Sequence, residues 1–455
     1  MSRQRFLFVD PVPGFAVTSI RSLVQLALQS LLVLSNPTAA HDAPSSILSG
    51  AKHTVPDYVA RYAPLVWLHS EDPFRPADLL KHIQHTTPTI NQKPLSGLPE
   101  KLDLDNLAVL NDADGGRVSL TSNDDITALP SWLLGETPDE SGKVLNSTPC
   151  MVILVERSPS EVDAFFFYFY SYDRGPNITQ VLPPLNGLIE DTEDGMHFGD
   201  HVGDWEHNMV RFQDGKPRGI YYSQHRDGSA YDWDDEGLSL KDERPIVFSA
   251  YGSHANYASD GDHIHDDVLV DYCDAGLIWD PVLSAYFYHL DPDTFTLTRL
   301  LPPGSNVSAA SNLTSFFYFD GIWGDAQYPD DHPRQKVVPY FGLKRFVSGP
   351  QGPAVKHLVR KGLMPDHRRT KSWLEWGVGV FMSLYPCCFR GWRVWVSLVV
   401  LAGLIVLVVL GVKFGLRRYR TRRQGYKKVD TEIAMEEIGS RENLVSSSTE
   451  EDESR

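Results

Sequence analysis

A seven-residue segment, residues 201–207, holds four side chains that can bind metals or move protons. If residues 204–212 form a strand, Asp204 and Glu206 project from one face and His207 from the other. Two carboxylates on one face, joined by His201 from the preceding turn, suit a hard divalent cation such as magnesium, calcium or manganese. The alternative is a solvated edge strand that Trp205 anchors in the core. The segment alone leaves both interpretations open.

A second polar cluster, at residues 251–266, supplies a further candidate ligand. If the strand before this cluster lies near the first segment, His254 approaches the carboxylates and adds nitrogen to an oxygen site. The alternative for His254 is a core histidine bonded to backbone. For His263 and His265 we expect a solvated loop. The predicted metal ligands are His201, Asp204, Glu206 and His254.

Catalysis would require more than a bound cation. A metal-dependent hydrolase needs an open coordination position and a proton acceptor, and in that interpretation His254 assists proton transfer. The sequence contains no GxSxG, HExxH, phosphate-loop or dinucleotide-binding motif. Clustered histidines among acids would also suit a pH switch, and a structural scaffold is a further alternative. We therefore predict no catalytic residue and favour a binding module over an enzyme.

Short aromatic and β-branched segments separated by turn residues predict a mainly β fold. Residues 164–172 have the aromatic content of a buried strand. Asp-Gly pairs predict hairpins, so we expect a meander from the carboxylate strand through residues 219–225 to residues 244–250. A short helix is predicted at 76–84 and a long loop or insertion at 86–130. Many short strands in one region favour a β-sandwich-like domain with few short helices.

Both ends of the chain carry membrane signals. Residues 394–412 are uncharged and rich in leucine and valine, which predicts one C-terminal transmembrane helix. Eight lysines and arginines and no acid occupy the sixteen residues after it, against two arginines in the sixteen before it, so the C-terminus should be cytosolic. Residues 1–40 have the basic leader, apolar stretch and small residues of a signal peptide, with an uncleaved signal anchor as the alternative.

These signals divide the chain into five parts. We expect the signal peptide to be followed by a lumenal β-rich domain at 41–369 and a juxtamembrane segment at 370–393. The transmembrane helix at 394–412 then leads into a cytosolic tail at 413–455, which is acidic and should be disordered after residue 428. The protein is therefore predicted to be a single-pass type I membrane protein of the endomembrane system.

The predicted lumenal domain contains modification signals. An oxidising lumen would allow a disulfide between Cys150 and Cys273. The formal net charge of −17 argues against nucleic acid binding, and topology and anionic lipid explain the basic stretch beside the membrane. The expected partners are the membrane and a lumenal protein or lipid ligand. Four sequons predict N-glycosylation at Asn146, Asn177, Asn306 and Asn312.

Three separated motifs, at residues 62–67, 201–207 and 251–257, resemble the fungal vacuolar protein sorting-associated protein 62 family. The resemblance covers most of the predicted lumenal domain, from residue 58 to residue 345. It implies a link to protein delivery to the vacuole and a location in the vacuolar or endosomal membrane. It brings no established catalytic residues.

Residues 201–206 also resemble, more weakly, the Gly-His-Arg-His-Asp-Trp-Glu signature of secreted necrosis-inducing proteins. In that family the signature lies on a β-sandwich, where its first histidine, its aspartate and its glutamate surround a divalent cation used in binding membrane sphingolipid. The matching residues here are His201, Asp204 and Glu206. The second histidine is replaced by Gly203 and the arginine by Val202, so the resemblance implies metal binding and leaves lipid binding unassigned.

Overall fold

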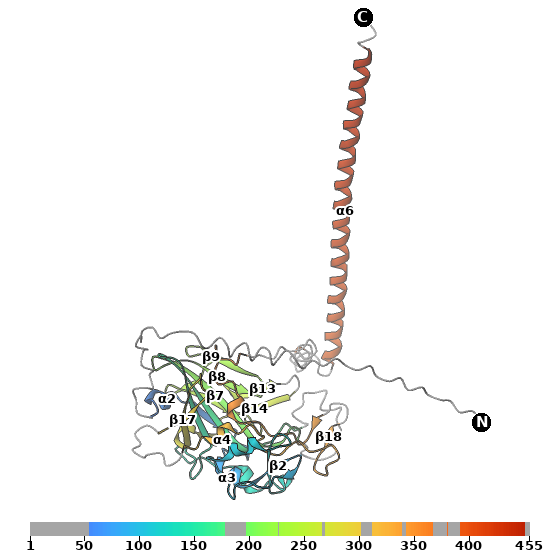
Figure 1. The fold of residues 1–455 in the computed structure, drawn as a ribbon. Helices are drawn as coiled ribbons and strands as arrows, with labels where there is room; N and C mark the ends of the chain where they lie inside the picture. The colour runs from blue at the N-terminus through green and yellow to red at the C-terminus, as the bar shows by residue number, and fades with distance from the viewer. Residues whose placement is uncertain are drawn as a thin grey trace, which may run out of the picture. The chain divides into compact units, whose positions relative to one another are not determined.

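The computed structural model describes residues 54–177, 197–225, 227–265, 269–301, 312–338, 343–366, 380 and 392–450. Residues 51–455 form a unit separate from residues 1–50. The predicted signal peptide, Asn306 and most of the juxtamembrane segment lie outside the described residues. Strands dominate the described domain, and its helices are short apart from one long C-terminal helix (Figure 1). The predicted mainly β fold is confirmed.

The larger sheet has seven strands and contains the carboxylate strand, β7. Its order is β17-β16-β5-β6-β7-β8-β9, and neighbouring strands are antiparallel except for the parallel pair β16 and β5. The strands are β5 (Cys150–Ser158), β6 (Glu161–Asp173), β7 (His201–Gln213), β8 (Lys216–Gln224), β9 (Asp227–Asp232), β16 (Ala285–Leu290) and β17 (Leu297–Leu300).

A smaller sheet, in the order β10-β11-β1-β15 with β12 paired to β11, forms the other layer of a sandwich. The predicted meander is right for the hairpin of β7 and β8 and wrong for its third strand, because residues 244–249 belong to the smaller sheet. The turn falls at His225, with a φ of 49°, so Asp227 already starts β9 beside β8. The strands are β1 (Leu65–Leu68), β10 (Leu240–Lys241), β11 (Arg244–Ser249), β12 (Asn256–Tyr257) and β15 (Leu277–Trp279).

The larger sheet is covered on both faces. Phe166 and Tyr168 of β6 pack with Val247 between the two sheets. Phe165 and Phe167 point the other way, into a second core. From residue 162 onward every β6 side chain is buried. A strand buried on both faces has no polar face, which explains the unbroken aromatic run at residues 164–172.

The second core lies beneath helices and a small sheet. Helix α3 (Leu79–Gln84) starts later than predicted because Asp78 caps it by accepting a 2.8 Å hydrogen bond from the backbone N–H of Lys81. The expected loop at 86–130 is wrong, since this region forms a three-stranded sheet in the order β3-β2-β4. The elements here are β2 (Thr86–Ile90), β3 (Lys93–Pro94), β4 (Ser119–Ser122), α4 (Ser315–Tyr318) and the 3₁₀ helices η1 (Leu107–Asp112), η2 (Ile126–Ala128) and η3 (Ser131–Leu134).

Several short elements complete the domain. The expected solvated loop at His263 is instead a strand of a hairpin, and the His263 ring stacks on Tyr257 at 3.9 Å between ring centres. The same strand contains His265. The elements are α2 (Asp57–Arg61), β13 (Gly261–His265), β14 (Leu269–Cys273), β18 (Val337–Val338), β19 (Leu343–Lys344), η6 (Pro281–Ser284) and η7 (Pro353–Val355).

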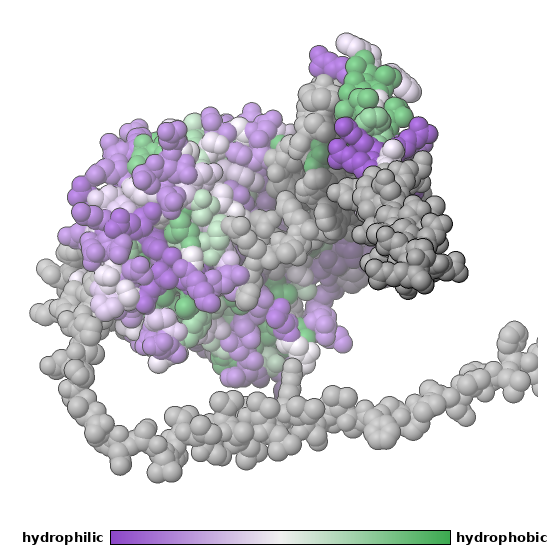
Figure 2. All heavy atoms as spheres, turned by 90° about the horizontal axis from the view of Figure 1, so that it is seen from above, coloured by the Kyte–Doolittle hydropathy of each residue, from purple (hydrophilic) through white to green (hydrophobic). Residues whose placement is uncertain are grey.

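One long helix, α6 (Arg393–Glu450), follows the domain. Its segment Trp395–Arg422 is long and apolar enough to cross a membrane, and it contains most of the span predicted at 394–412. Figure 2 shows apolar residues gathered on this helix, whereas the surface of the β-domain is mostly hydrophilic. The helix continues to Glu450, so the expectation of a disordered tail is wrong for residues 429–450.

The two cysteines of the domain are free thiols. Cys150, on β5, is buried between the two sheets. Cys273, on β14, packs in a separate small cluster with Ala250 and Ala255. The predicted disulfide between Cys150 and Cys273 is therefore not formed, because the fold assigns the two residues to different cores.

Two backbone segments touch without side chains between them at the start of β7. Gly203 has a φ of +72°, and a Cβ there would lie 1.9 Å from the carbonyl oxygen of Trp323. A Cβ at Gly324 would lie 1.9 Å from the carbonyl oxygen of Val202. Glycine at both positions is thus a steric requirement.

The Trp323 carbonyl is held by a buried histidine of α3. His82 donates from Nε2 to this carbonyl at 3.1 Å and accepts at Nδ1 from the Ser171 hydroxyl at 3.1 Å. The bond accepted at Nδ1 needs a neutral ring. Burial lowers the pKa of His82 to about 3, although the bond to Trp323 opposes the shift.

We expect Gly203→Ala to destabilise the domain by about 3 kcal/mol, from a left-handed alanine together with the clash at Trp323. The matched control is Gly199→Ala, because Gly199 also has a positive φ, +86°, but nothing lies within 4 Å of a Cβ there. Its expected cost is about 1 kcal/mol. Thermal unfolding of both variants measures the difference, and equal losses would show that the close contact is unimportant.

His82 should make the domain less stable in acid. Its folded pKa lies below the unfolded value, so its contribution is complete above about pH 6.5 and falls as pH drops toward the folded pKa. Between pH 7 and pH 5 the loss from this residue is about 2 kcal/mol. Denaturant unfolding at both pH values should show a smaller acid loss for His82→Gln than for the unchanged protein. Equal acid losses would contradict the assignment.

Candidate functional site

The site lies at the start of β7, between the two sheets. Asp204 and Glu206 face the interior of the sandwich and are 5% and 6% exposed. His207 lies on the opposite face, where its Nε2 accepts a 2.9 Å hydrogen bond from Arg360. The predicted division of β7 into two faces is confirmed. The expected solvated edge strand is wrong, because β7 is a buried inner strand.

A third carboxylate, Asp173, comes from β6. The β6–β7 register pairs Tyr170 with Asp204 and Asp173 with His201, which brings the end of β6 beside the start of β7. Asp173 is 8% exposed. Sequence reasoning missed it. The available signal was an acid at the end of a strand whose other residues were expected to be buried.

His254 reaches the site from the smaller sheet. It lies in the loop after β11, and its Nδ1 donates to Asp204 Oδ2 at 3.0 Å. Its ring stacks flat on Tyr170, with ring centres 3.7 Å apart. The predicted approach of His254 to the carboxylates is correct, but it occurs across the sandwich rather than along a meander.

A fourth acid, Asp72, closes the site on the far side of His254. Its Oδ2 lies 3.6 Å from His254 Nε2. The same carboxylate accepts backbone N–H bonds from Phe74 and Gly252, each at 2.9 Å. These bonds tie the loop of Asp72 to the loop of His254. No local pattern marked Asp72 in the sequence, because its partner Gly252 is 180 residues away and His254 lies in the same distant loop.

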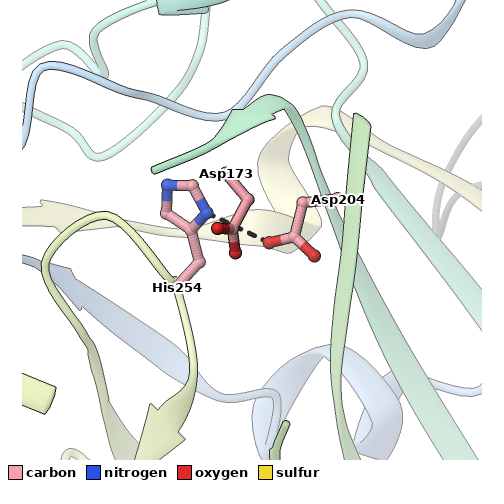
Figure 3. Close-up of side chains that lie close together, drawn as sticks. All are labelled: Asp173, Asp204 and His254. Carbon is pink, nitrogen blue, oxygen red and sulfur yellow. Dashed lines mark hydrogen bonds and ion pairs between the residues drawn. The ribbon is translucent and has the colours of Figure 1, made fainter. Parts of the chain in front are cut away.

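The predicted ligands do not all converge. Within the described residues, one ligand atom each of Asp173, Asp204 and His254 lie within 4.8 Å of one another, and Figure 3 shows these three side chains together. Glu206 is outside this set, and its Oε2 accepts a 2.5 Å hydrogen bond from Ser223. His201 is at the rim, bonded through Nδ1 to the Gly203 carbonyl at 2.7 Å, with Nε2 3.7 Å from Asp173.

The electrostatics reflect buried carboxylates that repel each other. Burial raises the pKa of Asp173 and of Glu206 well above their ordinary values, and the charge of Asp204 adds to both shifts. Burial acts on Asp204 in the same direction, but the hydrogen bond and charge of His254 outweigh it and lower its pKa. Burial also lowers the pKa of His201. A bound cation would relieve this repulsion.

One separation in the cluster suits a small cation that takes the place of the proton on His254 Nδ1. Two ligands about 2.1 Å from an octahedral ion, at right angles, lie about 3.0 Å apart, and His254 Nδ1 and Asp204 Oδ2 are separated by 3.0 Å. His254 Nε2 is buried and, in the part of the chain that is described, makes no hydrogen bond. His254 is therefore suited to act as a fixed ligand. Its side chain is 1% exposed, so it is poorly suited to exchange protons with solvent.

Three of the four predicted glycosylation residues lie among the described residues. Asn146 and Asn312 are exposed, and Asn177 is partly exposed. These positions are accessible to modification to different degrees, and the occupancy of the sequons stays a prediction.

Comparison with known proteins gives the relationships of the chain. The family model of vacuolar protein sorting-associated protein 62 matches residues 193–273, which include β7 and the loop of His254. Three solved structures of necrosis-inducing-type proteins are distant. Necrosis and ethylene inducing protein 2 from the causal agent of cocoa's witches' broom disease is 13% identical, with a TM-score of 0.22 over 46% of this chain and 69% of that one. The non-toxic HaNLP3 protein is 11% identical, with a TM-score of 0.25 over 63% and 88%.

Two Saccharomyces cerevisiae proteins are much more similar. Vacuolar protein sorting-associated protein 62 is 34% identical over 353 residues, which is 71% of this chain and 69% of the yeast protein. TDA6, whose name provisionally assigns it to vacuolar protein sorting, is 34% identical over 358 residues, or 71% of each chain. The resemblance seen in the three sequence motifs is confirmed, and the chain belongs to the vacuolar protein sorting-associated protein 62 family.

Proposed function

We propose that this protein acts in protein sorting to the vacuole, and that its β-sandwich binds a lumenal ligand or partner near a divalent cation. The sorting role is supported by the names of the two yeast relatives. The membrane attachment is supported by the apolar segment Trp395–Arg422. The binding role follows from the buried cluster of Asp173, Asp204 and His254.

That cluster is the observation that carries the metal proposal. Buried like charges cost free energy unless a cation or protons neutralise them. In this proposal Asp173, Asp204 and His254 hold the ion, and Glu206 and His201 support it from either side. The imidazole and carboxylate donors suit magnesium, calcium or manganese, and among these the nitrogen favours manganese.

The hydrolase alternative has less support. His254, the group expected to move protons, has one ring nitrogen bonded to Asp204 and the other directed at Asp72. Its ring is also covered by Tyr170. A binding module needs only the ion and a surface, so we retain it as the function.

We further propose a type I topology in a vacuolar or endosomal membrane, with the β-domain lumenal and the C-terminus cytosolic. The charge asymmetry around the apolar segment supports this direction. The exposed positions of Asn146 and Asn312 are compatible with lumenal glycosylation.

The metal proposal predicts one divalent ion per chain at the cluster of Asp173, Asp204 and His254 in the detergent-solubilised full-length protein, after exposure to manganese or magnesium and removal of free ion. Mass spectrometry should show that Asp204→Asn weakens retention by roughly tenfold or more, because it removes a ligand charge. The control is Asp325→Asn, a buried carboxylate that is bonded to Ser122 and Tyr328 instead. Equal metal content in all three proteins, or none in any, would refute the site.

The topology predicts an endoglycosidase-sensitive form of the protein in a fungal host. Asn146→Gln combined with Asn312→Gln should lower the glycosylated mass, since both sites are exposed. Asn123→Gln is the matched control, because Asn123 is also exposed and is not in a sequon. An unmodified full-length protein carrying both intact sequons would argue against a lumenal domain.

A further inference from the structure

A second group of polar atoms lies deeper in the sandwich, beyond the cluster of Asp173, Asp204 and His254. It is formed where β8 separates from β7. The ladder between them begins at the pair Asn208 and Tyr222, so Glu206 has no partner residue on β8 in the ladder. Instead Ser223 donates its hydroxyl hydrogen to Glu206.

Asn256 of β12 fills the opening between the strands. Its side-chain Nδ2 donates to the backbone carbonyl oxygen of His207 at 3.3 Å. The backbone carbonyl of Asn256 accepts from Gln224 Nε2 at 2.9 Å. Glu206 and Asn208 flank His207 on β7 and share the interior face. The Asn256 amide is therefore bonded to the β7 backbone at the residue between them.

The two amides present unused oxygens to this space. Asn208 Nδ2 donates to the Tyr221 carbonyl at 3.2 Å. Because each amide nitrogen is fixed by a backbone carbonyl, which can only accept, neither amide can be flipped. Asn208 and Asn256 are both 0% exposed, and among the residues with described positions neither Oδ1 has a hydrogen-bond partner. Buried acceptors of this kind normally have a donor or a cation.

The charge of the surroundings favours a cation over water. Four carboxylates in this region, Asp72, Asp173, Asp204 and Glu206, are each 8% exposed or less. The charge of Lys356, which is partly buried, acts to lower the pKa of Asp204 and of Glu206. One divalent ion at the outer cluster would neutralise two of the four charges. A water molecule at Glu206 would supply hydrogen bonds and no charge.

We propose that Glu206, Asn208 and Asn256 form a second, inner cation site with oxygen-only ligands, suited to calcium. Calcium accepts carboxylate and amide oxygens in flexible geometry, whereas magnesium demands near-ideal octahedral geometry and usually keeps several waters. The outer cluster includes a nitrogen ligand and the inner group does not. The inner site goes beyond the proposed function, because it uses different ligands and does not require the outer ion.

Calcium content per chain, measured by mass spectrometry on the full-length protein in detergent, tests the inner site. The unchanged protein should retain calcium after free ion is removed, and calcium should raise its melting temperature. Asn208→Leu removes the oxygen at similar volume and should reduce retention tenfold or more. Asn208→Asp keeps an oxygen ligand and should retain calcium. Asp173→Asn changes only the outer cluster and should retain it as well.

Three results would overturn the inner site. One is calcium retention by Asn208→Leu equal to that of the unchanged protein, and another is no retention by the unchanged protein, as expected if water or a protonated Glu206 serves the amide oxygens. The third is equal calcium loss in Asp173→Asn and Asn208→Leu, which would indicate one shared site. If Asn208→Leu does not fold, Asn256→Ala replaces it. Failure of the outer site is distinguishable, since manganese content would then be unaffected by Asp173→Asn.

Discussion

The direct backbone contact between residues 202–203 and residues 323–324 is the constraint on which the site depends. Without side chains between the segments, the start of β7 lies against the Trp323 carbonyl, which His82 also binds. This contact bends the chain at Gly203, two residues after His201 and immediately before Asp204. The carbonyl of Gly203 then accepts from His201. The outer end of the site is thus positioned by segments that contribute no ligand.

The fold also buries the carboxylates of the site instead of exposing them to solvent. The larger sheet is covered on both faces, so any polar residue on β7 must find its partner inside the protein. On the face of the sheet that points into the second core, His207 is bonded to Arg360. The Arg360 guanidinium lies over the rings of Phe165 and Tyr221. On the inner face, the acids meet His254, Ser223 and each other. The two faces of one strand are therefore both polar at this end, which is uncommon for a central strand.

The sequence predicted those parts of the fold that depend on local patterns of residues. The period of two placed Asp204 and Glu206 together, and the aromatic run marked β6 as buried. The partner of β11 was not predictable in this way, because the choice between the two sheets depends on contacts with β1, nearly 180 residues earlier. Asp72 and Asp173 were missed for the same reason, since only the register of β6 and β7 and a long loop bring them near. The prediction of a disulfide was wrong because an oxidising compartment allows a bond only between cysteines that the fold brings close together.

The segment from the loop after β11 to the start of β12 joins the two halves of the site. The loop supplies His254 to the outer cluster and β12 supplies Asn256 to the inner group, and these residues are only two apart. His254 has a φ of 54°, a conformation that costs free energy for a residue other than glycine. Its bond to Asp204 and its stacking on Tyr170 offset that cost. The outer cluster and the inner group therefore depend on one short stretch of backbone for their positions.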